Sequence, residues 1–187
     1  MALIIFLHQL VFQGMFFAKN ITLGRKLGKR IRGFNLEASL SIGFFMVFIG
    51  LSLFFALSDS APGRHSLLPG SVALASGVLL LVVNVLLGMA SLRDLGDSWR
   101  VGVIREQATE LVETGIYRHS RNPYFVAYLL MFAAYTVLLQ NLILLGLSLV
   151  GLGMVHAMIR KEEKYLAGLH GEAYRDYTQR VPRYLFL

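Results

Sequence analysis

The sequence predicts an all-α membrane protein with about five transmembrane helices, a C-terminal helical hairpin and an amphipathic cytoplasmic tail. Hydrophobic residues make up 56% of the 187 residues and charged residues only 16%, whereas soluble domains are roughly 45–50% apolar. The mean hydropathy is +0.60, and the apolar residues form long runs with basic residues at their ends. The chain has no cysteine, so it can form neither a disulfide nor a thiolate metal site.

The first three apolar runs each predict one transmembrane helix. Residues 1–20 lack the positive n-region and the cleavage pattern of a signal peptide, so we expect a retained helix. Residues 37–57 and 71–92 are each long enough to cross a hydrocarbon core of roughly 30 Å at about 1.5 Å per residue. We expect one membrane domain over residues 1–187, with three spans in residues 1–92 and a cofactor-binding half in residues 93–187.

The fourth apolar run predicts a hairpin of two helices. Residues 123–159 comprise 37 residues without Asp, Glu, Lys or Arg, too many for one span, and Gln140-Asn141 interrupts them near the middle. Asn122 and Pro123 are typical of the N-cap and the first position of a helix. Beyond the run, residues 160–187 carry tyrosines and leucines at helical spacing and predict the amphipathic tail.

The basic residues predict the orientation in the membrane. Seventeen of the eighteen Lys and Arg residues fall on one side of the predicted spans, and Arg64 is the exception. Because basic loops stay in the cytoplasm, we expect the N-terminus outside and the C-terminus in the cytoplasm. These residues are distributed over segments that each abut a span, which favours the lipid bilayer as their partner and excludes nucleic acid.

Two polar clusters flank the predicted hairpin, residues 109–125 (TELVETGIYRHSRNPYF) and residues 160–163 (RKEE). The helix start beside Arg121 exposes N–H groups that favour an anion. The hairpin brings Glu162 and Glu163 to nearly the same level, where they need a positive partner. Surface pairing with Lys161, Lys164 or Arg118 is one alternative. A zwitterion such as the amino-acid end of S-adenosylmethionine is the other.

At these residues the chain resembles the integral-membrane methyltransferases typified by isoprenylcysteine carboxyl methyltransferase and, more distantly, the phospholipid methyltransferases. The shared pattern is L-V-x-x-G-x-Y, an R-H-P-x-Y-like element, a hairpin, an acidic pair and a G-x-x-Y-x-x-Y-x-x-x-V-P-like tail. It occurs here as residues 111–117, 121–125, 162–163 and 171–182. The resemblance covers the chain from about Arg93 onward.

The resemblance implies that the protein binds S-adenosylmethionine and transfers its methyl group to a hydrophobic or lipid acceptor. The resemblance implies that the cofactor is bound by Thr109, Glu110, Leu111, Val112, Tyr117, Asn122, Pro123, Tyr124, Phe125 and Glu162. The charge argument adds Arg121 and Glu163 to this predicted cofactor site. We expect Glu162 to orient the donor's ammonium and Arg121 its carboxylate. Arg160 is the candidate for contacting the acceptor.

Two positions depart from the pattern of the resembled family. Asn122 replaces a histidine, so no imidazole serves there as a base. Met158 stands where the prenylcysteine enzymes have an arginine that recognises the substrate carboxylate or acts in catalysis. The sequence therefore leaves two kinds of acceptor open, a prenylcysteine and another lipid or hydrophobic molecule.

Other interpretations remain open from the sequence. One is a membrane reductase similar to the sterol reductases, which uses NADPH, and another is a non-catalytic membrane subunit. The five histidines show no ligand spacing, so no metal site is expected. Asn84 and His156 lie inside predicted spans and are expected to form interhelical hydrogen bonds. Ser39 with Gly43, Ala73 with Gly77, and the Gly151 region indicate close helix packing.

Overall fold

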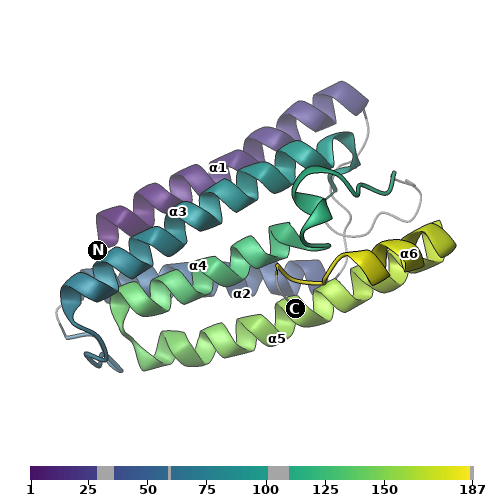
Figure 1. The fold of residues 1–187 in the computed structure, drawn as a ribbon. Coiled ribbons are helices and arrows are strands. Elements are labelled where there is room, and N and C mark those ends of the chain that lie inside the picture. The colour runs from purple at the N-terminus through teal and green to yellow at the C-terminus, as the bar shows by residue number, and fades with distance from the viewer. Residues whose placement is uncertain (29–35, 59, 101–109, 186–187) are drawn as a thin grey trace.

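The computed structural model describes residues 1–28, 36–58, 60–100 and 110–185 (Figure 1), and over these residues it confirms the all-α fold. Its helices are α1 (Ala2–Leu27), α2 (Leu36–Leu57), α3 (Gly70–Leu95), α4 (Pro123–Leu139), α5 (Leu142–His170) and α6 (Glu172–Arg180). Two short 3₁₀ helices, η1 (Gly96–Ser98) and η2 (Gly115–Arg118), lie between α3 and α4.

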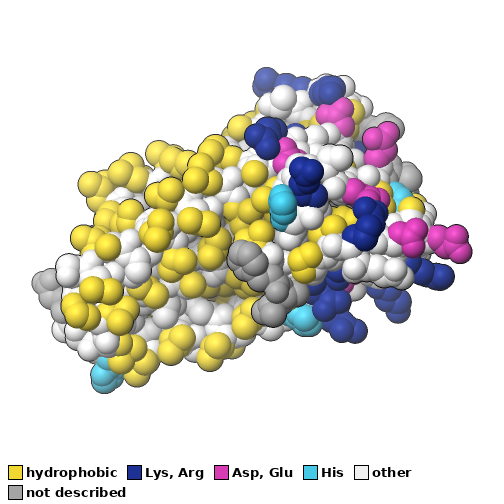
Figure 2. Space-filling model, viewed as in Figure 1, with side chains coloured by type: hydrophobic (Ala, Val, Ile, Leu, Met, Phe, Trp, Pro, Cys, Tyr) yellow, Lys and Arg dark blue, Asp and Glu magenta, His cyan; other side chains and the backbone are white. Residues whose placement is uncertain are grey.

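Within the described residues, four helices are long and apolar enough to cross a membrane: α1, α2, α3 and α5. This confirms a polytopic membrane protein. Helix α4 has 17 residues, which at about 1.5 Å per residue gives roughly 26 Å, slightly less than the hydrocarbon core. The count of five spans therefore stays a prediction. Figure 2 shows hydrophobic side chains over most of the bundle and charged side chains gathered at one end.

The predicted hairpin is confirmed, and its turn lies at Gln140-Asn141. Gln140 adopts a left-handed conformation with φ 45°, and Asn141 caps α5 by accepting hydrogen bonds from the N–H groups of Ile143 (2.9 Å) and Leu144 (3.2 Å). The loop before α3 holds the same turn, because the His65 N–H donates to the Gln140 carbonyl at 2.9 Å. Local polar chemistry therefore ends one helix and starts the next.

The tail differs from the prediction in one respect. Helix α5 continues without a break from the apolar run through the charged cluster to His170. The chain then turns at Gly171, whose φ of 57° favours glycine, and α6 packs with Tyr174 and Tyr177 buried. After α6 the chain runs back toward the start of α4 (Figure 1). We call residues 181–185 the C-terminal strap.

A buried polar network joins α1, α3 and α4 inside the bundle. The two ring nitrogens of His8 lie 2.7 Å from the Tyr135 hydroxyl and 2.7 Å from the Asn84 Oδ1. The Asn84 Nδ2 donates to the Ala127 carbonyl at 2.5 Å. This confirms the interhelical bonding expected of Asn84. His156 instead bonds the hydroxyl of Tyr184, which lies in the C-terminal strap, at 2.7 Å.

Small residues permit close helix packing at two of the three predicted places. A Cβ atom on Gly77 would overlap the Leu138 side chain, and one on Gly151 would lie 2.6 Å from Phe132. Gly43 has open space around it, with nothing within 4 Å of such an atom. Helices α3 and α5 therefore approach α4 through glycines, whereas Gly43 on α2 does not mark a close contact.

Candidate functional site

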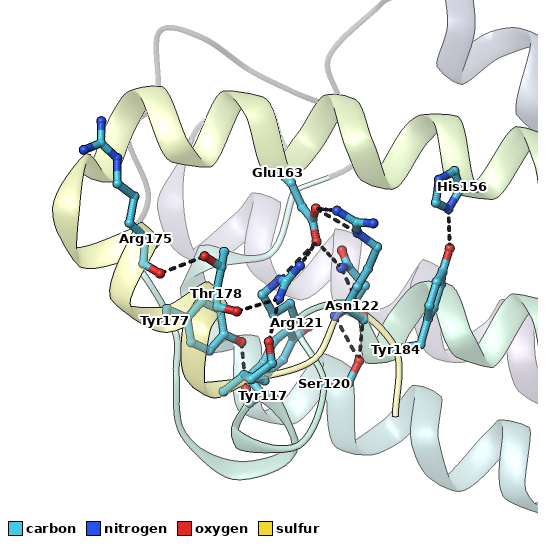
Figure 3. A network of polar contacts seen from close by, with 12 residues as sticks. Tyr117, Ser120, Arg121, Asn122, His156, Glu163, Arg175, Tyr177, Thr178 and Tyr184 are labelled. Atoms are coloured by element: carbon cyan, nitrogen blue, oxygen red, sulfur yellow. Dashed lines mark hydrogen bonds and ion pairs between the residues drawn. The ribbon is translucent and has the colours of Figure 1, made fainter. Parts of the chain in front are cut away.

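The candidate site lies at the charged end of the bundle, where η2, the start of α4, the end of α5, α6 and the C-terminal strap meet (Figure 3). Asp94 near the end of α3 positions η2, because its carboxylate accepts a hydrogen bond from the Ile116 N–H at 2.8 Å. Gly115 has φ 61°, and a Cβ atom there would overlap the Asp94 carboxylate. Only glycine fits this position, which explains the glycine in the L-V-x-x-G-x-Y element.

Arg121 joins the start of α4 to α5 and to the chain after α6. Its Nη2 and Nε lie 3.0 Å and 3.1 Å from the Glu163 Oε1. Its Nη1 donates to the carbonyls of Thr178 (3.2 Å) and Val181 (2.5 Å). The Tyr174 hydroxyl is a further hydrogen-bond partner of Arg121, so the guanidinium is bound mainly within the protein. The Arg121 side chain is only 10% exposed.

Asn122 occupies the predicted N-cap position, and Pro123 follows at the helix start, but the Asn122 side chain makes no capping hydrogen bond. Its Nδ2 instead donates to the Glu163 Oε1 at 3.1 Å and to the Arg183 carbonyl at 3.2 Å. The side chain at this position therefore links α4 to α5 and to the C-terminal strap.

Glu163 is the acidic residue that receives these contacts. Besides Arg121 and Asn122, the Arg183 Nε and Nη2 lie 2.9 Å and 2.8 Å from its Oε2. Burial would raise the pKa of Glu163, but the hydrogen bond from Arg183, the charge of Arg121 and the hydrogen bond from Asn122 outweigh it and hold the pKa below its usual value. The negative charge of Glu163 is thus compensated by cationic and amide groups of the protein itself.

Glu162 has different surroundings, because adjacent helical residues point about 100° apart. It lies on the charged extension of α5, beyond the uncharged run that ends at Ile159. Its carboxylate forms no hydrogen bond or ion pair with any residue that the structure describes. The residue is exposed, but partial desolvation of its carboxyl group, and secondly the charge of Glu163, raise its pKa to about 7.

Tyr117 lies near Glu162 on the side of η2. Burial, and secondly the charge of Glu162, raise the pKa of the Tyr117 phenol. Its main-chain carbonyl accepts a hydrogen bond from the Tyr177 hydroxyl at 2.7 Å, which ties η2 to α6. Tyr124 is partly buried, and its ring centre lies 5.0 Å from that of Trp99. Two predicted tyrosines therefore hold fixed positions beside the unpaired carboxylate.

The remaining predicted residues lie in several places. Pro123 and Phe125 are buried at the start of α4, and Leu111 and Val112 are partly buried before η2. Glu110 is exposed, and its carbonyl accepts from the Ser98 hydroxyl at 3.3 Å. Thr109 lies outside the described residues. Arg160 lines a pocket together with Glu163, on a different face of α5 from Glu162.

Sequence reasoning missed the residues of the C-terminal strap. Arg183 shares Glu163 with Arg121, and the Ser120 hydroxyl donates to the Arg183 carbonyl at 3.2 Å. The Arg121 N–H donates to the Pro182 carbonyl at 2.9 Å. The Val181-Pro182 pair in the tail element was the available signal, because both carbonyls accept hydrogen bonds from Arg121.

The fold and this end of the bundle define a class of protein: an integral-membrane α-helical protein with a charged site at one end of its spans. A family model described as phospholipid methyltransferase matches residues 72–173, which is more than half of the chain. The chain therefore belongs to the phospholipid methyltransferase family, and the resemblance inferred from the motifs is confirmed. No curated protein is similar enough to the chain to count as a match. Membership of this family implies a methyltransferase that acts on a lipid-like substrate.

Proposed function

We propose that this protein transfers a methyl group from S-adenosylmethionine to a hydrophobic or lipid-like acceptor at the cytoplasmic face of the membrane. The family supplies the reaction class. The observation that carries the donor assignment is the exposed Glu162 carboxylate, which has no hydrogen-bonding or ionic partner among the described residues and whose pKa is raised by desolvation. An uncompensated carboxylate in such surroundings is stabilised by a cation, and S-adenosylmethionine carries both an ammonium and a sulfonium.

In this proposal the donor lies between Glu162, Tyr117 and the start of α4. Glu162 orients the ammonium, and the buried Tyr117 with Tyr124 shapes the pocket. The first-turn N–H groups of α4 are the donors offered to the carboxylate, and the Arg121 guanidinium beside them adds positive charge. The main role of Arg121 is to hold Glu163 and the C-terminal strap, so that these groups keep their positions.

In methyl transfer, the main task of the protein is to align the donor and the acceptor. The sulfonium already activates the methyl group, which passes to a nucleophilic atom of the acceptor as the carbon–sulfur bond breaks. The protein holds the two reactants in line and excludes water. Residues 93–187 would supply the donor site, and residues 1–92 would supply three of the membrane helices.

The cytoplasmic location follows from the distribution of charge. Arg25 and Lys26 lie in the last turn of α1, and Arg93 lies in the last turn of α3. Figure 2 shows Lys and Arg side chains gathered at one end of the bundle. Arg64 belongs to the loop that contacts the α4–α5 turn at the other end. Since basic segments remain in the cytoplasm, the charged end with its site would face the cytoplasm.

The test is donor binding by Glu162→Gln. Equilibrium dialysis of labelled S-adenosylmethionine against the purified chain should show saturable binding, and the substitution should weaken it by roughly 10- to 100-fold, the value of a charge-assisted hydrogen bond. The matched control is Glu172→Gln, which removes an exposed carboxylate from the first turn of α6 and should leave the affinity unchanged.

The same preparation separates the alternative functions. Stabilisation against unfolding by NADPH but not by S-adenosylmethionine would indicate a reductase, since only a true ligand raises the unfolding temperature by mass action. Folded protein that binds neither would indicate a non-catalytic subunit. Either result would reject the proposed methyl transfer.

A further inference from the structure

A second concave site lies on the other side of α5 from Glu162. It is a pocket of about 270 Å³ between α5 and α6, lined by Arg160, Glu163, Lys164, Ala167, Tyr174, Arg175, Thr178 and Arg183. The α5 residues that line it are spaced three, four and seven positions after Arg160, so they share one face of the helix. Glu162 is two positions after Arg160, about 200° around the helix. Glu162 therefore lies on a different face of α5 from the pocket, whereas Arg121 is bonded to the lining residues Glu163 and Thr178.

The pocket has an excess of positive charge that the protein does not compensate. Four of its lining side chains are cationic and one is acidic. That acid, Glu163, is already bonded to Arg121 and Arg183. The side chains of Arg160, Lys164 and Arg175 form no hydrogen bond or ion pair with the part of the chain that the structure describes. Figure 3 shows Arg175 pointing away from the Glu163 network.

We propose that this pocket binds the phosphate group of an anionic membrane lipid. A phosphate offers several acceptor oxygens and more charge than a carboxylate, and it matches the fork of an arginine and the point charge of a lysine. Arg160 and Lys164 approach it from α5, and Arg175 approaches from α6. Because these groups come from two helices, the bound phosphate would also hold α6 against α5.

The position of Arg160 favours a lipid over a soluble anion as the source of the phosphate. Arg160 directly follows Ile159, the last residue of the uncharged run. The pocket therefore begins at the edge of the apolar surface, where lipid headgroups lie. Basic pockets of this kind on the cytoplasmic side bind lipid headgroups. The lipid is not the methyl acceptor of the proposed reaction, because Glu162 lies on a different face of α5. The proposal also does not depend on the identity of the methyl donor.

The test is binding of short-chain phosphatidic acid to the purified full-length chain in detergent, measured by the rise in its unfolding temperature. Short-chain diacylglycerol carries the same tails without the phosphate and should give no saturable rise. Lys164→Gln/Arg175→Gln should weaken phosphatidic acid binding on the order of tenfold. Arg25→Gln/Arg118→Gln removes two cations outside the pocket lining from the same end of the protein and should have little effect.

Three results would overturn the proposal. The first is equal stabilisation by phosphatidic acid and diacylglycerol, and the second is equal weakening by the two double variants. The third is binding of inorganic phosphate as tight as that of phosphatidic acid, which would reject a lipid as the source. The single variants K164Q and R175Q are measured beside the double variant, so that a folding defect in the double variant does not decide the result.

Discussion

The neighbouring carboxylates Glu162 and Glu163 show how one residue of helical rotation separates two roles. Glu163 accepts hydrogen bonds from Arg121, Asn122 and Arg183, and its pKa is held low. Glu162 has no such partner among the described residues, and desolvation followed by the charge of Glu163 raises its pKa to about 7. Glu163 is therefore bound within the protein, whereas Glu162 is the carboxylate that the proposed function assigns to the donor.

The raised pKa of Glu162 predicts a pH dependence for donor binding. In the free protein the carboxyl group takes up a proton as the pH falls through about 7. Because the donor's ammonium binds the ionised form, its affinity should be greatest above this pKa and weaken by up to about tenfold per pH unit below it. Dialysis of labelled donor from about pH 8 to pH 5 measures this dependence.

The control for this experiment is Glu162→Gln, which should show weak binding that changes little over the same pH range. Glu163 affects stability rather than donor binding. Its depressed pKa contributes stability above the usual carboxyl pKa, and this stability is lost as the pH falls through the depressed value. Folding is therefore checked at each pH. An equal slope in the variant and the natural protein would contradict the role of Glu162.

At the scale of elements, the parts that depend on local chemistry were predictable and the long-range contacts were not. Gln140-Asn141 and Asn122-Pro123 predicted where helices end and begin, because turns and helix starts depend on neighbouring residues. The contacts of Arg121 with Val181 join residues 60 positions apart. No local pattern specifies such a contact. The sequence therefore placed Arg121 with the donor but did not reveal that its N–H groups bond Glu163, α6 and the C-terminal strap.

The contact between Asp94 and the 3₁₀ helix η2 can be tested by substituting Gly115. Gly115→Ala places a Cβ atom against the Asp94 carboxylate and also strains a positive φ of 61°. We expect a loss of stability of about 1–3 kcal/mol and weaker donor binding, because Tyr117 moves with η2. Gly28→Ala is the matched control, since Gly28 has φ 59° and nothing within 4 Å of an added Cβ atom. Thermal unfolding and donor affinity are measured for both.

The control separates steric contact from backbone strain. Gly28→Ala carries only the strain, so it should lose less stability and keep its donor affinity. If the two substitutions gave equal losses in unfolding temperature and unchanged donor binding, the contact between Asp94 and η2 would not position the site.

At the scale of the whole molecule, α4 extends between the same two ends as α3. Its start adjoins η2, which Asp94 of α3 holds. Its last turn adjoins the loop before α3, where the Leu68 N–H donates to the Gln140 Oε1 at 2.7 Å. Helix α4 covers this distance with 17 residues, whereas α3 has 26. This arrangement supports the prediction that α4 is a fifth span and that both of its neighbours, α3 and α5, run antiparallel to it.

The orientation in the membrane can be tested by cysteine labelling, because the natural chain has no cysteine. Ser66→Cys places a thiol in the exposed loop before α3, and Gln179→Cys places one on the exposed surface of α6. The positive-inside distribution predicts that a membrane-impermeant maleimide labels Ser66→Cys in intact cells and labels Gln179→Cys only after permeabilisation. Both variants should label in detergent, which controls for thiol reactivity. The reverse pattern would place the charged end outside the cytoplasm, and labelling of both thiols in intact cells would mean that α3 to α6 do not cross the membrane an odd number of times.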